Sequence, residues 1–81
     1  MGMTRTVNTF KKLQEVDDVD LKYAVETLHG MYYAALSGKI TPNEVHRRIN
    51  DWEIREKVRP EYQEDFNFLV NSTKTLAFQN G

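Results

Sequence analysis

The stretch 36–45 constrains this chain more than any other, because it ends one helix and begins the next. Gly38 follows a run of periodic apolar residues, at the position where a left-handed residue usually closes a helix. Thr41 precedes Pro42 and Glu44, which is the arrangement of a capping box with proline in the first turn. The sequence therefore predicts two helices joined by a tight turn.

Apolar residues recur at intervals of three and four along most of the chain, the pattern of amphipathic helices. After a frayed start at residues 1–6, Asn8 or Thr9 caps the first predicted helix and Asp17 caps the second. Pro60 begins the last one, and the final residues, 79–81, are expected to fray. The predicted helices cover about 8–16, 18–37, 42–58 and 60–77.

The third predicted helix is ambiguous beyond Asp51, where its apolar phase slips and residues 52–59 alternate with a period near two. The alternatives are a helix broken near residue 51, a continuous helix that buries two faces, and an extended segment. No second strand is evident for pairing, which favours helix. Short connections favour antiparallel neighbours. We therefore predict an all-α fold, a single helical domain over 1–81 packed as a compact bundle of three or four helices.

Composition narrows the class of protein. The 81 residues contain no cysteine, which excludes a disulfide framework and thiolate metal ligands. No apolar run approaches the ~18 residues that span a bilayer, so we expect no membrane association and a cytoplasmic location. The net charge of −1 argues against a general nucleic-acid binder, whose affinity comes from many phosphate contacts.

Motifs for catalysis or metal binding are missing from the sequence. The two histidines, His29 and His46, lie in different predicted helices and lack the short spacing of paired metal ligands. There is no glycine-rich phosphate loop and no nucleophile motif. We expect no enzyme activity, no metal and no cofactor.

Two surfaces are candidates for binding. Arg48, Trp52, Arg55 and Arg59 would form one stripe if the third helix continues, and tryptophan and arginine are enriched in binding hot spots. The plainer interpretation is that Trp52 belongs to the core, with arginine stems packed over it.

The second predicted helix offers the other surface, away from its main apolar face. Tyr23 and Tyr33 lie outside that face, and Gly30 with Ala34 forms a notch that another backbone could approach closely. This notch is a candidate for self-association as a homodimer; the alternative is that the bundle itself buries it.

We therefore predict a non-enzymatic protein-binding module that masks a partner, such as an inhibitor, adaptor or immunity-type factor, as small bacterial and bacteriophage regulators often are. Its expected contacts are Tyr23, Tyr33, Arg48, Trp52, Arg55 and Arg59. The alternative is a helix-turn-helix-like DNA-binding regulator that uses 42–51 as recognition helix, with His46, Arg47 and Arg48 facing the groove.

Overall fold

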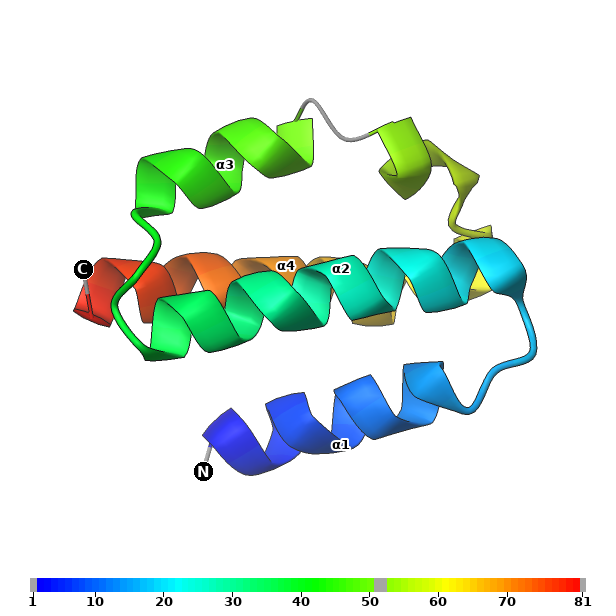
Figure 1. Ribbon diagram of the computed structural model, residues 1–81. Coiled ribbons are helices and arrows are strands. Elements are labelled where there is room, and N and C mark those ends of the chain that lie inside the picture. The colour runs from blue at the N-terminus through cyan, green and yellow to red at the C-terminus, as the bar shows by residue number, and fades with distance from the viewer. Residues whose placement is uncertain (1, 51–52, 81) are drawn as a thin grey trace.

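The computed structural model describes residues 2–50 and 53–80, and all their regular structure is helical. The all-α prediction is therefore confirmed. In chain order the elements (Figure 1) are α1 (Gly2–Gln14), α2 (Val19–Leu36), α3 (Pro42–Asn50), the short 3-10 helix η1 (Glu53–Lys57) and α4 (Pro60–Asn80).

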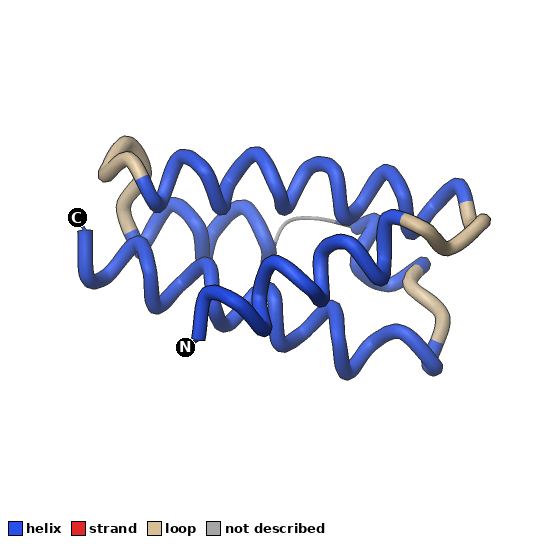
Figure 2. The backbone as a smooth tube through the Cα atoms, turned by 90° about the horizontal axis from the view of Figure 1, so that it is seen from below, coloured by secondary structure: helices blue, strands red, loops and turns tan. Residues whose placement is uncertain are grey.

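The two longest helices, α2 and α4, run parallel and form the centre of the molecule. At one end Arg59 Nε lies 3.2 Å from Asp18 Oδ2. At the other end the side-chain amide of Asn80 donates to the carbonyl oxygens of Ala35 and Leu36, at 3.3 and 3.4 Å. Helix α1 packs between the two on one side, and α3 with η1 covers the opposite side (Figure 2).

The expectation of antiparallel neighbours holds only for helices adjacent in the chain. Helix α1 runs antiparallel to α2, and α3 runs back along α2 and α4. Because α3 and η1 together return the chain to the end where α2 began, α4 starts beside the first turn of α2 and follows its direction.

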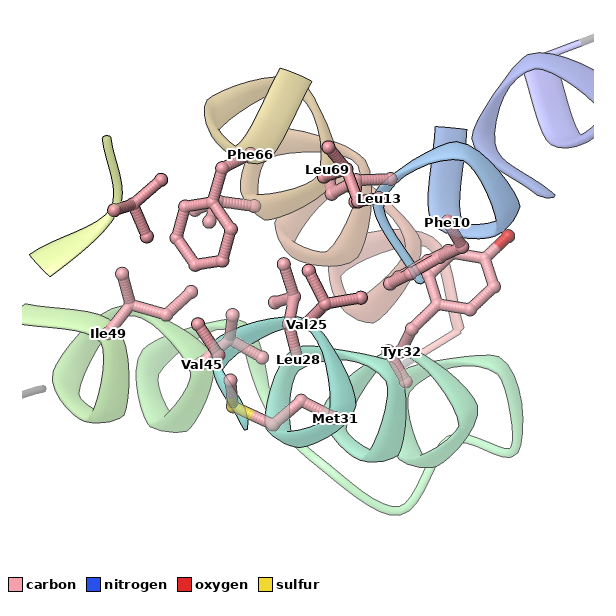
Figure 3. Close-up of a cluster of buried hydrophobic side chains, with 14 of the residues drawn as sticks. Phe10, Leu13, Val25, Leu28, Met31, Tyr32, Val45, Ile49, Phe66 and Leu69 are labelled. Atoms are coloured by element: carbon pink, nitrogen blue, oxygen red, sulfur yellow. The ribbon is translucent and has the colours of Figure 1, made fainter. Parts of the chain in front are cut away.

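The core fills the space between the four α-helices (Figure 3). Phe10 and Tyr32 lie together on one side of it, and Val45, Ile49 and Phe66 gather on the other. Its largest fully enclosed apolar side chains are Leu13, Leu21, Leu28, Val25, Val45, Ile49, Phe66, Leu69 and Val70.

The turn after α2 has the predicted geometry. Gly38 has a φ of 70°, and Lys39 N donates to Ala34 O at 2.8 Å while Gly38 N donates to Ala35 O at 3.2 Å, which is a Schellman motif. Glu44 N donates to Thr41 Oγ1 at 3.2 Å, as the capping box requires.

A capping box also predicts that the Glu44 carboxylate accepts a bond from the Thr41 amide, but this bond is replaced by a contact within α3. Among the described residues, the Glu44 carboxylate has no bond to the Thr41 amide and instead lies 3.9 Å from Arg48 Nη2. Glu44 is thus one turn from an arginine, at the i,i+4 spacing that supports an exposed helix.

Helix α1 begins earlier than predicted, at Gly2 instead of near Asn8, and ends at Gln14. Thr6 and Thr9 continue its buried face toward the N-terminus, and Thr9 Oγ1 donates to Arg5 O at 2.8 Å. Because threonine was counted as polar, the sequence pattern concealed this turn, and the prediction of a frayed start and of a cap at Asn8 or Thr9 was wrong.

The N-cap of α2 is Asp18, not the predicted Asp17. Asp18 has an extended backbone and its Oδ1 accepts from Leu21 N at 3.2 Å. Its Oδ2 meets Arg59, whereas Asp17 is fully exposed and lies 3.8 Å from Lys22 Nζ. Of the two adjacent aspartates, the one that caps α2 is therefore also the one that contacts the residue before α4.

The third predicted helix is interrupted, as the broken-helix alternative expected. Helix α3 ends at Asn50 and η1 begins at Glu53. The last helix extends to Asn80 instead of Ala77, so the expected fraying of residues 79 and 80 is wrong. The bonds from Asn80 to α2 supply the physical reason.

Candidate functional site

A chain of aromatic rings leads from the core to the surface between α1 and α2. The ring of Phe10, which is buried, lies 4.9 Å from the ring of His29 in an edge-to-face contact. His29 in turn lies 4.7 Å from Tyr33 at 89°, and Tyr32 is 5.4 Å from Phe10 and 6.2 Å from Tyr33. Aromatic pairs in this geometry add about 0.5–1.5 kcal/mol beyond area burial, so the Tyr33 ring is held from two sides.

The sequence builds this arrangement from helical spacing. His29 and Tyr33 are four residues apart on α2, so their side chains are neighbours on one face of the helix. Phe10 projects from α1 and contacts the rings of His29 and Tyr32. No pattern within one helix predicts this cluster, because half of its contacts join α1 to α2.

Two exposed aliphatic side chains extend the aromatic surface. Val7 lies one turn before Phe10 on α1, and Leu36 lies one turn after Tyr33 on α2; because the helices are antiparallel, both lie toward the same end of the pair. Val7 is 42% exposed, Leu36 38% and Tyr33 55%. We call Val7, Phe10, His29, Tyr33 and Leu36 the α1–α2 aromatic surface.

Burial changes the acidity of one phenol beneath this surface. Removal from water raises the pKa of Tyr32 above its ordinary value, and the neighbouring Tyr33 raises it further. Tyr32 is therefore neutral at physiological pH, and its ring contributes apolar contact without charge.

The three arginines of the predicted stripe do not share one helix in the part of the chain that the structure describes. Arg48 belongs to α3, whereas Arg59 lies next to the N-cap of α2. Arg55, in η1, donates from Nη2 to Asn67 Oδ1 on α4 at 2.9 Å. Trp52 lies outside the described residues.

Arg55 contributes to a cavity that the sequence did not indicate. It has a volume of about 330 Å³ and lies between α3, η1 and α4. Phe66 and Ile49 give it an apolar side, and the other lining residues are polar: Asn50, Arg55, Glu56, Gln63 and Asn67. The Arg55 guanidinium donates to Asn67, and Glu56 is the other charged residue of the described lining.

Tyr23 and the glycine notch lie on the outward part of α2. Tyr23 is 59% exposed, and a Cβ built at Gly30 would meet no atom within 4 Å, whereas Ala34 is half-buried. Burial of Gly30 by its own bundle, the alternative left open by the sequence, is thus excluded. Tyr23 and Tyr33 are ten residues apart, about 15 Å along the helix axis.

The three residues of the DNA-binding alternative are exposed on α3. Nδ2 of Asn50 lies 2.9 Å from Nε2 of His46, and Arg48 lies near Glu44. Arg47 is also exposed. Within the described part of the chain, no group of three or more histidine, aspartate or glutamate residues could hold a metal ion.

Comparison with protein families, with curated proteins and with solved structures finds no match to this chain. Among the described helices, none combines the length and apolar character needed to cross a membrane.

Proposed function

We propose that this protein is a non-enzymatic binding module of the cytoplasm that masks the surface of a partner protein, as an inhibitor, adaptor or immunity-type factor does. Its contact region in this proposal is the α1–α2 aromatic surface. The observation that carries the proposal is Tyr33, whose ring is 55% exposed and yet packed edge-to-face on His29. Tyrosine is enriched among residues that dominate binding energy.

Preorganisation makes Tyr33 a stronger candidate than an isolated exposed tyrosine. A side chain that binding must immobilise costs roughly 0.5–1.5 kcal/mol of ordering. The contacts with His29 and Tyr32 already restrict Tyr33 in the free protein. Val7 on α1 and Leu36 on α2 are also exposed and add apolar area to this pair of helices, and exposed apolar patches often mark interaction sites.

The contact residues in this proposal differ from those predicted from the sequence, and only Tyr33 is common to both sets. Arg48, Arg55 and Arg59 each have a partner within α3, on α4 or at the start of α2. Arg48 and Arg55 are separated from the α1–α2 aromatic surface because α1 and α3 pack on opposite sides of the central pair. Arg59 lies beside the start of α2, whereas Tyr33 lies near its end. Tyr23 faces outward on α2 and belongs to a different surface.

Site-specific photocrosslinking in the native cell tests the proposal. The residue p-benzoylphenylalanine replaces Tyr33 in one variant and Asn71, an exposed position on α4, in the control. We expect a crosslinked partner protein at position 33 that is missing at position 71. The same pattern of crosslinks at both positions, or none at position 33, would contradict the proposal.

Once captured, the partner allows the ring itself to be tested. Tyr33→Ala should weaken the affinity by about tenfold or more, as for a binding hot spot. Tyr33→Phe keeps the ring and is the matched control. If Tyr33→Ala retains its helical circular dichroism and binds as tightly as the wild type, the contact surface has been assigned wrongly.

DNA binding is the second candidate, favoured by the exposure of the consecutive residues His46, Arg47 and Arg48 on one turn of α3. In this case affinity for a duplex should fall steeply with salt, and the Arg47→Ala, Arg48→Ala double variant should not bind. The absence of gel retardation for any duplex at low salt would exclude it.

A further inference from the structure

The outward face of α2 carries a row of residues that the bundle leaves largely uncovered. Val19 is 83% exposed and Tyr23 is 59% exposed. Further along the helix come Gly30, with open space around it, and Ala34, which is half-buried and partly packed against the core. The four positions follow each other at intervals of four, seven and four residues, so they lie on one face.

Gly30 has no role within the chain that explains a glycine. It lies in the middle of α2, where glycine costs about 1 kcal/mol relative to alanine. The positive φ that would require glycine occurs at Gly38, and an added Cβ at Gly30 would touch nothing. The described fold therefore does not require glycine at this position.

The order of large and small residues on this face is self-complementary. A two-fold axis between Glu26 and Thr27 places Tyr23 of one copy opposite Gly30 of another, because the two positions are equally distant from the axis. The same axis places Val19 opposite Ala34. Symmetric dimers use one patch on both subunits in this way.

We infer that a second copy of this chain docks antiparallel on the outward face of α2, with the Tyr23 ring of each copy seated over Gly30 of the other. The self-association surface consists of Val19, Tyr23, Gly30 and Ala34. It is separate from the contact surface of the proposed function, so the two proposals can fail independently.

Charges at the ends of α2 support the antiparallel orientation. The N-terminal end exposes Asp17 and Asp20 beside Lys22, whose Nζ lies 3.8 Å from Asp17 Oδ1, so one acidic group is in excess there; the C-terminal end exposes Lys39. An antiparallel copy brings the acidic end of one α2 toward the basic end of the other, and it also opposes the two helix dipoles favourably. A parallel copy would bring like charges together at both ends.

The size of the surface indicates a weak dimer. Fully buried tyrosines contribute roughly 150–250 Å² each, and Tyr23 is already partly covered. The four residues therefore fall below the roughly 800 Å² per partner of a stable interface. Glu26 also lies near its own copy across the axis, where like charges oppose association.

Sedimentation equilibrium of the full chain from about 10 μM to 1 mM tests this inference in the range of weak affinity. We expect the wild type to approach twice the monomer mass with rising concentration. Gly30→Gln, which covers the notch with a good helix former, should weaken association at least about tenfold. Asn71→Gln on α4 is the control and should associate as the wild type does.

Charge variants test the orientation. Glu26→Gln should strengthen association. Lys39→Glu should weaken association, and the addition of Asp17→Lys to the same chain should restore it. A wild type that stays monomeric at the highest concentration, or Gly30→Gln that associates like the wild type, would overturn the inference. Failure of the second charge change to restore association would overturn the antiparallel arrangement.

Discussion

Gly38 and Gly30 show how differently two glycines can act in one chain. Gly38 has a φ of 70°, and a Cβ placed there would lie 3.0 Å from the backbone oxygen of Asn80. Gly30 has neither constraint. The first glycine is required by the turn and by the close approach of α4, while the second is tolerated by the monomer at a cost.

Alanine at the two positions should therefore change stability in opposite directions. Gly38→Ala forces a left-handed alanine against Asn80 and should lower the free energy of unfolding by about 1–3 kcal/mol. Gly30→Ala should raise it by up to about 1 kcal/mol. Urea unfolding at a low protein concentration measures both, and a loss of stability in Gly30→Ala would show that this position is not open in the monomer.

Tyr32 should make the protein less stable at alkaline pH. Its raised pKa means that the folded state holds the phenol proton more firmly than the unfolded chain does. The free energy of unfolding should therefore fall as the pH rises above about 10, the ordinary tyrosine value. Tyr32→Phe should make this fall shallower.

Deprotonation of Lys12 also lowers the free energy of unfolding at alkaline pH, so the experiment on Tyr32 must control for it. Its hydrogen bond and charge attraction with Asp65, at 2.8 Å, raise the pKa of Lys12, so this contribution is also lost above pH 10.5. The comparison should therefore be made between the Lys12→Met variant and the Lys12→Met, Tyr32→Phe double variant. Parallel alkaline unfolding curves with and without Tyr32→Phe would contradict the role assigned to the phenol.

At the scale of helices, the C-terminal end of α4 acts as a cap for α2. The Asn80 amide bonds two carbonyl oxygens at the end of α2. Asn80→Ala should lower the free energy of unfolding by about 1 kcal/mol and reduce amide protection in the last turns of both helices. Gln79→Ala, an exposed neighbour, is the control; equal effects of the two changes would argue against the cap.

Helix ends that are marked by local sequence motifs could be predicted from the sequence. Gly38, Thr41 and Pro60 mark helix ends through their own backbone chemistry, and the structure has those ends where expected. The start of α1 and the last turn of α4 depend on contacts with other helices, so their bounds were missed. The same is true of Asp18, which is both a cap and a partner of Arg59.

The candidate site was only partly accessible to sequence reasoning. Tyr23 and Tyr33 were expected to lie off the buried face of their helix, and both are exposed. The ring contacts that hold Tyr33 depend on α1 reaching α2 at Phe10, which no spacing within α2 encodes. The arginine stripe needed a continuous helix through residues 51 and 52, and α3 ends at Asn50.

On the scale of the whole molecule, the parallel arrangement of α2 and α4 distinguishes this fold from a simple up-and-down bundle. Each helix is tied to the other at both ends, by Asp18 with Arg59 and by Asn80 with Ala35 and Leu36. Helix α3 and η1 cover the length between those ends (Figure 1). No residue pattern predicts this parallel arrangement, because the direction of each helix is set by the path of the chain.

The parallel central pair also has a kinetic consequence. Asn80 and Ala35 are 45 residues apart, so their helices meet only after a long loop has closed. Closure entropy grows slowly with length, about 0.6 kcal/mol per doubling, but it opposes docking before any distant contact has formed. The hairpin of α1 and α2 can form early, whereas α4 joins it late; the length and stiffness of the intervening segment therefore help to set how fast the chain reaches its native state.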